Sequence, residues 1–254
     1  MKKIIAIMLC LCLSGCSGAI PTSGNPDKSY GWGLKKIQNS APEVPQYIKD
    51  MLRENNSVYM GNPDDKKVYL TFDEGYENGY TSVILDTLKE KNVKAAFFIT
   101  GDYLNRSEDL VKRMIDEGHI VGNHTIGHRN LAKMQNEEDI KKEITDLSDL
   151  FKEKFGTEMI YVRPPEGEYS ERVLSVMNDM GLRCVFWSFA YKDWIADSKK
   201  GKDFAVGQIM PYLHNGMVIL LHAVSEDNAE ALPEVIDKAR AQGFEFGVLD
   251  DIYK

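Results

Sequence analysis

The fold is decided by a pattern that begins at residues 68–75, which have the sequence VYLTFDEG. A run rich in residues of high β propensity ends in two adjacent carboxylates and a glycine, as is typical of a buried strand followed by a turn. Residues 80–92 carry apolar side chains along one helical face, and residues 95–100 form a second apolar run. A strand, a helix and a strand in this order predict a parallel sheet that is covered on both faces.

The same alternation continues to the C-terminus. Predicted strands lie at 68–72, 95–100, 119–122, 160–163, 184–189, 217–221 and 244–249. Predicted helices lie at 80–92, 107–117, 137–155, 170–180, 203–213 and 229–241. About seven parallel strands in an α/β chain fit either a doubly wound sheet or a distorted (β/α) barrel with surrounding helices. Polar residues just past the strand ends favour the barrel, because a barrel gathers those ends at one mouth.

The first 65 residues have a different character. Two lysines and an apolar run at 4–13, too short to span a bilayer comfortably, precede Leu-Ser-Gly-Cys at 13–16. This sequence resembles the bacterial lipobox. It predicts an exported lipoprotein with a signal peptide at 1–16, lipidated at Cys16 and anchored to the outer face of the cell membrane. An ordinary secretory signal that is cut slightly later is the alternative.

Between this signal and the predicted sheet, two segments are expected. Residues 17–33 are rich in small and polar residues at their start and are predicted to be a flexible tether. Residues 34–65 contain short amphipathic pieces and are predicted to be a lead-in that packs on the domain formed by residues 66–254.

The overall composition limits the kinds of partner. The 254 residues are 43% hydrophobic and 28% charged, with a net charge of −8, so no basic face suggests nucleic acid. Any attraction to an anionic glycan must therefore be local. Cys184 is the only cysteine after residue 16, and it lies in an apolar run, so we expect it to pack in the core without a disulfide. We expect the protein to be a monomer.

Two pairs of residues suggest a metal site. His124 and His128 follow a predicted strand and lie four residues apart, a spacing at which both imidazoles can reach one cation. Asp73 and Glu74 end the first strand, where two carboxylates need a compensating cation or arginine. The glycine that follows permits a turn that brings both into the mouth. A surface histidine pair and a solvated acidic turn are the structural alternatives.

Two further polar residues follow predicted strands. Arg163 precedes two prolines that fix the backbone, so its guanidinium is expected to face the mouth, where it can keep a carboxylate ionised. His222 ends the most hydrophobic strand in the chain. A satisfied core histidine is the alternative to a catalytic one at this position.

These motifs together resemble the polysaccharide deacetylases of carbohydrate esterase family 4, the NodB homology domain, over residues 66–252. The matching motifs are TFDEG at 71–75, HTIGH at 124–128, RPPEG at 163–167, DW at 193–194 and LLH at 220–222. The stretches at 75–81, 186–194 and 222–229 are similar to those of the delta-lactam-biosynthetic de-N-acetylases of sporulating bacteria. Those enzymes act on peptide-free N-acetylmuramic acid in peptidoglycan, on the route to the muramic-δ-lactam of the spore cortex.

The resemblance implies a hydrolase that removes acetyl groups from peptidoglycan glycan strands, and it assigns the roles. Asp73 would be the base that takes a proton from water, with Arg163 orienting it. His222 would protonate the leaving amine, with Asp193 holding the imidazole in its charged form. The implied cofactor is a divalent metal, Zn²⁺ before Mn²⁺ or Co²⁺. Its implied ligands are Glu74, His124 and His128.

The resemblance also implies contacts with the substrate. The oxyanion would meet the metal and a backbone N–H near Tyr169 or Glu168. Trp187 and Trp194 are expected to pack against other residues rather than to stack on a sugar ring.

Two residues depart from the family pattern. Glu74 stands where the family usually has aspartate, which leaves the metal and the need for it open. Glu166 stands where the sporulation enzymes tend to have a basic residue, and it would repel the lactyl carboxylate of muramic acid. Arg129, Lys192 and Arg172 are the candidates for supplying a positive charge instead.

Two kinds of alternative function remain. The substrate could be N-acetylglucosamine in peptidoglycan, a chitin-like oligomer or acetylated xylan. The chain could instead be a catalytically silent glycan-binding lipoprotein, for which Glu74 is the only supporting feature. Asp73 and His222 argue against that alternative, because a binding module needs no base and acid together.

Overall fold

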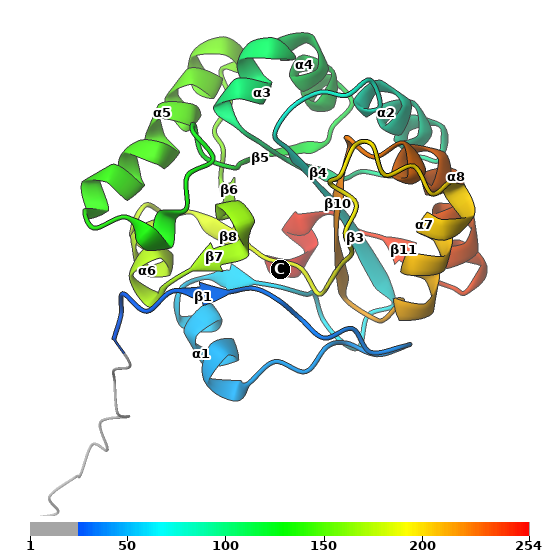
Figure 1. Ribbon diagram of the computed structural model, residues 1–254, viewed down its shortest axis with the longest axis horizontal. Helices are drawn as coiled ribbons and strands as arrows, with labels where there is room; N and C mark the ends of the chain where they lie inside the picture. Colours follow the sequence, from blue (N-terminus) through cyan, green and yellow to red (C-terminus); the bar gives the residue numbers. More distant parts are fainter. Residues whose placement is uncertain (1–24, 254) are drawn as a thin grey trace, which may run out of the picture.

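The computed structural model describes residues 25–253, which fold around one curled sheet (Figure 1). The sheet has nine strands in the order β2-β8-β6-β5-β4-β3-β10-β9, with β11 paired to β3, and every pairing is parallel. Its strands are β2 (Ser57–Val58), β3 (Lys67–Glu74), β4 (Ala96–Ile99), β5 (Ile120–Asn123), β6 (Tyr161–Val162), β8 (Arg183–Val185), β9 (Phe189–Ala190), β10 (Met217–His222) and β11 (Glu245–Phe246). The predicted α/β fold with a distorted parallel barrel is confirmed.

The strand predicted at 184–189 is two strands in the structure. Its first half, β8, pairs with β6 and β2, whereas its second half, β9, pairs with β10. Between them, Phe186 donates its backbone N–H to Val58 (2.8 Å) and Ser188 donates its own to Val218 (2.9 Å). The chain therefore crosses from one end of the curled sheet to the other. In the described part of the chain, no strand pairing joins β9 to β2, so the barrel is incomplete.

The helices surround the sheet and begin where capping side chains are available. Thr100, Asn136, Ser170 and Ser225 each accept a backbone N–H from the first turn of the helix that follows. The helices are α1 (Gln46–Glu54), α2 (Thr81–Glu90), α3 (Gly101–Arg106), α4 (Glu108–Asp116), α5 (Glu137–Phe155), α6 (Glu171–Asp179), α7 (Lys202–Ile209) and α8 (Glu226–Ala241). Within residues 25–253, none of them is both long enough and apolar enough to cross a membrane.

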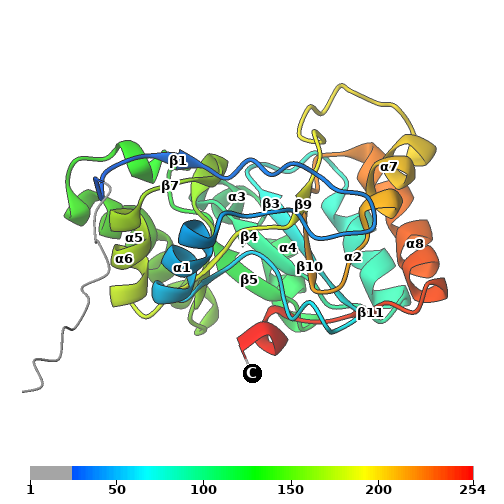
Figure 2. The same cartoon turned by 90° about the horizontal axis from the view of Figure 1, so that it is seen from below.

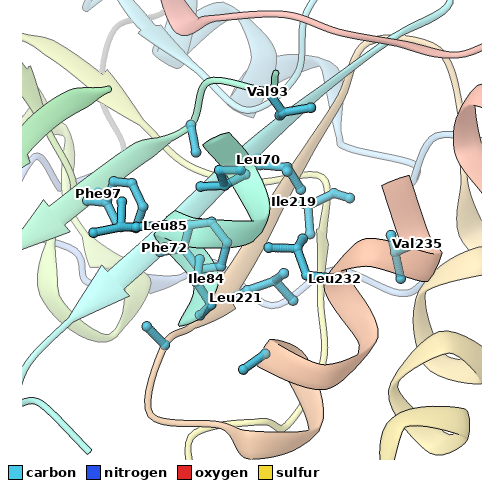
Figure 3. Packing of buried hydrophobic residues seen from close by; sticks show 14 of the residues in the cluster. Leu70, Phe72, Ile84, Leu85, Val93, Phe97, Ile219, Leu221, Leu232 and Val235 are labelled. Atoms are coloured by element: carbon cyan, nitrogen blue, oxygen red, sulfur yellow. The ribbon is translucent and has the colours of Figure 1, made fainter. Parts of the chain in front are cut away.

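The largest core cluster lies between the sheet and its outer helices. Figure 3 shows side chains of β3, β4 and β10, such as Phe72, Phe97 and Ile219, packed against those of α2 and α8, such as Leu85 and Leu232. Alternate residues of β3 face the opposite side of the sheet, where Tyr69 belongs to a separate, smaller cluster. This alternation lets β3 bury both of its faces, as a parallel strand covered by helices must.

The lead-in crosses the incomplete side of the barrel. Its first strand, β1 (Tyr30–Gly31), pairs antiparallel with β7 (Glu168–Tyr169). Farther along, Asn39 donates its backbone N–H to Pro211, next to α7 (3.0 Å). Figure 2 shows this blue segment running from β1 to the side of α7.

The packed part of the lead-in begins earlier than residue 34, where the sequence placed the end of the tether. Strand β1 is already paired, and Trp32 is buried with its indole N–H donated to the Trp187 carbonyl (2.8 Å). Aromatic packing of Trp32 on Phe186 and Tyr169 explains why these residues are ordered. The predicted signal peptide and Cys16 lie outside the described residues.

Candidate active site

The mouth of the barrel contains a cavity of about 920 Å³. Its wall is formed by residues at or after the carboxyl ends of several strands together with part of the lead-in. The site residues from the sequence that line it are Asp73, His124, His128, Trp187, Trp194 and His222. The carboxyl ends of parallel strands are thus gathered as the sequence predicted.

Asp73 is held by a buried arginine. The Arg163 guanidinium donates to one carboxylate oxygen at 2.7 Å and to the carbonyls of Val185 and Phe186 at 2.8 and 3.2 Å. Burial alone would raise the pKa of Asp73, but Arg163 and the histidines beside the carboxylate bring that pKa below its ordinary value. Asp73 is therefore an ionised carboxylate in the cavity wall.

His222 is held by Asp193. The imidazole Nδ1 donates to the carboxylate at 2.8 Å, and the backbone N–H of His222 donates to the other carboxylate oxygen at 2.9 Å. Burial would lower the pKa of His222, but Asp193 raises it above its ordinary value. The histidine therefore favours the protonated form, with Nε2 left for a ligand in the cavity.

Asn228 is a positioning residue that the sequence did not single out. Its side-chain amide donates to Asp193 at 2.6 Å and to the His222 carbonyl at 3.2 Å, while the Tyr191 hydroxyl donates to its oxygen. Asn228 lies in the stretch 222–229 that resembles the sporulation enzymes, so this stretch was the available signal.

The base and the acid lie side by side on neighbouring strands. His222 of β10 is the direct partner of Asp73 of β3 in the strand register. Parallel strands are about 4.8 Å apart, so the two side chains can act on one group in the cavity. Their pKa values are shifted in opposite directions, which is typical of a pair that divides the roles of base and acid.

The two histidines after β5 also come together. Their ring centroids are 4.8 Å apart. His124 donates through Nδ1 to the Arg163 carbonyl at 2.8 Å, and its Nε2 lies 3.5 Å from Asp73. Burial lowers the pKa of His124 to about 4, so this imidazole is neutral and Nε2 is free to accept. A neutral imidazole is the form that binds metals.

Glu74 is placed away from the histidines. Pairing with β4 continues through Glu74, opposite Ile99, so strand alternation turns this side chain away from the cavity that Asp73 lines. Its carboxylate is fully buried near Glu77 and Tyr103, and neither oxygen has a hydrogen-bond partner. Burial, with Glu77 and Asp73, holds the pKa of Glu74 well above its ordinary value.

The three expected metal ligands therefore do not lie together in the structure. In the described range, no group of three or more histidine, cysteine or carboxylate side chains is arranged to hold a metal ion. The structure supplies the pair His124 and His128, but it leaves Glu74 on the other side of β3. The turn expected after Gly75 does not bring both carboxylates into the mouth, because β3 remains paired to its last residue.

The residues expected to contact substrate have different surroundings. Tyr169 is buried, stacks on Tyr30 at 5.5 Å and is not part of the cavity wall. Trp187 lines the cavity, and its ring centroid lies 5.7 Å from the Arg163 guanidinium. Trp194 is 52% exposed, with its ring 5.7 Å from that of His222, so the expectation that this side chain packs against other residues is wrong for about half of its surface.

Glu166 lines the cavity, and none of the three proposed substitutes for a basic residue there does. Its backbone has a positive φ of 62°, and its carboxylate accepts a hydrogen bond from Asn130 at 2.8 Å. Arg129 pairs with Glu143, and Arg172 donates to Asp27. None of the three candidates therefore supplies a positive charge to the cavity wall.

A buried carboxylate beside a carboxylate-held histidine, in the wall of a large cavity in a parallel barrel, is the arrangement of an enzyme that uses acid–base catalysis. Comparison with known proteins identifies the kind of enzyme. A model of the polysaccharide deacetylase family matches residues 60–185. The chain is 36% identical over 252 residues to the peptidoglycan-N-acetylmuramic acid deacetylase PdaA of Bacillus subtilis, a match that covers 98% of this chain and 95% of PdaA.

Solved structures agree with this match. The structure of B. subtilis PdaA, a family 4 carbohydrate esterase, gives a TM-score of 0.87 at 38% identity, covering 90% of this chain and 98% of PdaA. A family 4 carbohydrate esterase from Bacillus anthracis gives 0.76 at 42% identity, covering 89% and 97%. A peptidoglycan-N-acetylglucosamine deacetylase of Bacillus cereus is 32% identical over 201 residues, covering 78% and 72%.

The chain belongs to the polysaccharide deacetylase family, carbohydrate esterase family 4. It is a hydrolase of carbon–nitrogen bonds other than peptide bonds, as the sequence predicted. Deacetylases of this family are generally metal-dependent.

Proposed function

We propose that this enzyme removes the acetyl group from N-acetylmuramic acid in peptidoglycan. The observation that carries the proposal is the placement of Asp73 and His222 as register partners in the cavity wall, with pKa values shifted in opposite directions. The substrate is inferred from PdaA, which matches nearly the whole chain and has this activity by name.

The side chains suggest how the amide is hydrolysed. Asp73 accepts a proton from the water that attacks the acetyl carbonyl carbon. His222, protonated and held by Asp193, donates its proton to the sugar nitrogen as the carbon–nitrogen bond breaks. The products are acetate and the free amino sugar. Arg163 keeps Asp73 ionised and fixes its direction, so the base is ready before substrate arrives.

We propose that the metal of this enzyme is Zn²⁺, because the adjacent imidazoles of His124 and His128 suit it, with Mn²⁺ and Co²⁺ as alternatives. Glu74 is the proposed third protein ligand. In the structure it lies on the other side of β3 from the two histidines, so this ligand has less structural support than they have. Chelation and the substitution of Glu74 test the metal requirement separately from the acid–base pair.

We also propose the cellular setting. Signal cleavage before Cys16 and lipidation of this residue would anchor the enzyme to the outer face of the cell or forespore membrane, facing peptidoglycan. The similarity to sporulation enzymes supports peptide-free strands as the substrate and muramic-δ-lactam as the later product. Mass spectrometry of the mature N-terminus tests the anchor.

Acetate release from defined glycans tests the activity. Full-length protein would be given peptidoglycan strands with and without stem peptides, and chitin oligomers, each with chelator or with added Zn²⁺. We expect release from peptide-free strands, loss of release with chelator, and a decrease of at least about 100-fold in kcat for Asp73→Asn and for His222→Gln. Release from chitin oligomers alone would exclude the muramic acid substrate.

A second candidate function is the deacetylation of N-acetylglucosamine. Glu166 favours it, because an acidic residue in the cavity wall repels a lactyl carboxylate but not a neutral sugar. Full activity on N-acetylglucosamine strands, with none on muramic acid, would support this candidate. Glycan binding without acetate release under any metal condition would instead support a silent binding protein.

A further inference from the structure

The proposed substrate carries a charge that the protein must recognise. In a peptide-free strand, the lactyl group of muramic acid ends in a carboxylate, on the sugar carbon next to the one that bears the acetamido group. The protein has a net charge of −8, and Asp73, Asp102 and Glu166 line the cavity. A carboxylate will bind in such a cavity only beside a local cation.

Lys36 supplies a cation in the cavity wall. Among residues 25–253, it is the only lysine or arginine that lines the cavity. Its ammonium lies 4.9 Å from the centroid of the Tyr212 ring and 5.2 Å from that of Phe189. Within the described chain, no carboxylate forms an ion pair with Lys36. Its ammonium instead makes cation–π contacts with these two rings.

Lys36 is partly buried, and this burial affects the energy of its charge. Burial lowers the pKa of Lys36, which means that the site does not fully replace the water that the charge has lost. An anion that enters the cavity would restore this stabilisation, because a charge-assisted contact is strongest where water is excluded. A partly desolvated lysine without an acidic partner is thus suited to bind a carboxylate.

The lead-in holds Lys36 in place from both sides. Before it, Trp32 donates its backbone N–H to Gly167 at 2.9 Å and its indole N–H to Trp187 at 2.8 Å. After it, Asn39 donates to Pro211 at 3.0 Å. The backbone of the segment is therefore fixed before substrate binds, which reduces the entropy lost on binding.

We propose that Lys36 binds the lactyl carboxylate of peptide-free N-acetylmuramic acid and is a specificity-determining residue of this enzyme. The proposal rests on the proposed muramic acid substrate. It accounts for the acidic residue at position 166, because the positive charge comes from the lead-in rather than from the loop after β6. A stem peptide would convert the carboxylate to an amide and remove the charge that Lys36 recognises.

A pair of substrates that differ only in charge tests the proposal. One is a peptide-free strand with free lactyl carboxylates, and the other is the same strand with these groups converted to methylamides. Acetate release by full-length protein would give kcat and KM for wild type, Lys36→Met, Lys36→Arg and Lys35→Met. Lys35 is exposed and is not in the cavity wall, so it is the matched control.

We expect wild type to have a KM about tenfold lower for the free carboxylate, and Lys36→Met to lose this preference with little change in kcat. Lys36→Arg should retain most of the preference, and Lys35→Met should retain all of it. If Lys36→Met still prefers the carboxylate, or raises both KM values equally, the inference is wrong and the muramic acid substrate stands. If wild type releases no acetate from either strand, the proposed muramic acid substrate and the proposed role of Lys36 are both wrong.

Discussion

Asp73 and Glu74 are neighbours in sequence but lie on opposite sides of β3. Asp73 faces the cavity and is paired with Arg163, whereas Glu74 is buried among other elements with both oxygens unpartnered. The sequence identified both carboxylates because they end an apolar run. It could not show where strand pairing ends, and that depends on the contact of Glu74 with Ile99 of β4. Side-chain alternation then decides which carboxylate reaches the site.

Glu74→Met is expected to stabilise the protein. Methionine has a similar length, and it removes two buried oxygens that have no partner. We expect the free energy of unfolding to rise by about 1–3 kcal/mol at pH 7 in chelator, measured by urea denaturation. Asp73→Asn is the contrast, because it breaks a buried ion pair and should lower stability. A less stable Glu74→Met protein in chelator would show that this carboxylate has a partner in solution.

A second prediction at the scale of the residue concerns His119 and the pH dependence of the free energy of unfolding. Burial lowers the pKa of His119 to about 4, and its Nδ1 accepts the Ala95 backbone N–H at 3.1 Å. Below pH 6.5 the unfolded chain binds a proton at His119, whereas the folded protein binds this proton only below about pH 4. The stabilisation from this difference is therefore complete above pH 6.5. As the pH falls from 6.5 to 4, the free energy of unfolding decreases by up to about 3 kcal/mol.

His119→Asn should remove this part of the pH dependence, since asparagine can still accept the hydrogen bond but does not titrate. Urea unfolding of both proteins between pH 4 and 8 would measure it. The difference in unfolding free energy should move in favour of the variant as pH falls from 6.5 to 4. A difference that is constant with pH would mean that His119 is not the group responsible.

At the scale of elements, the sequence predicted most of the sheet and helices. The helix predicted at 137–155 agrees with α5 to the residue, because Asn136 caps its start and Gly156, with a φ of 68°, ends it. The apolar run at 184–189 predicts one strand, because a continuous apolar run does not show where the chain changes its pairing partner. Only the contacts of Phe186 with β2 and of Ser188 with β10 show that the chain changes sides.

Helix α5 also holds the loop that carries the histidine pair. Glu143 is buried, and its carboxylate accepts the Gly127 backbone N–H at 3.0 Å and pairs with Arg129 at 3.3 Å. We expect Glu143→Ala to lower kcat/KM about tenfold or more, because the loop around His128 would lose its support. Glu153→Ala, at an exposed position of the same helix, should have no such effect. Equal activity of the two variants would show that the loop holds its shape without Glu143.

At the scale of the molecule, the lead-in crosses the incomplete side of the barrel (Figure 2), a position that sequence periodicity does not reveal. The short amphipathic pieces within residues 34–65 predicted that the lead-in packs on the domain, but not which side of the sheet it covers. In the structure it lies across the incomplete side of the sheet and supplies Trp32 and Lys36 to the cavity wall. Aromatic contacts far apart in sequence determine this arrangement, and a single sequence does not reveal them.

If the lead-in is an integral part of the domain, substitution of Trp32 should lower the free energy of unfolding far more than substitution of Trp194. Trp32 is 5% exposed and packs on Tyr59, Tyr169 and Phe186, whereas Trp194 is 52% exposed at the mouth. We expect Trp32→Ala to cost about 3–5 kcal/mol of unfolding free energy and Trp194→Ala less than about 1 kcal/mol, by urea denaturation. Equal, small effects would mean that the lead-in is only a tether. Because Trp32 also supports the backbone that leads to Lys36, its loss should raise KM for peptide-free strands as well.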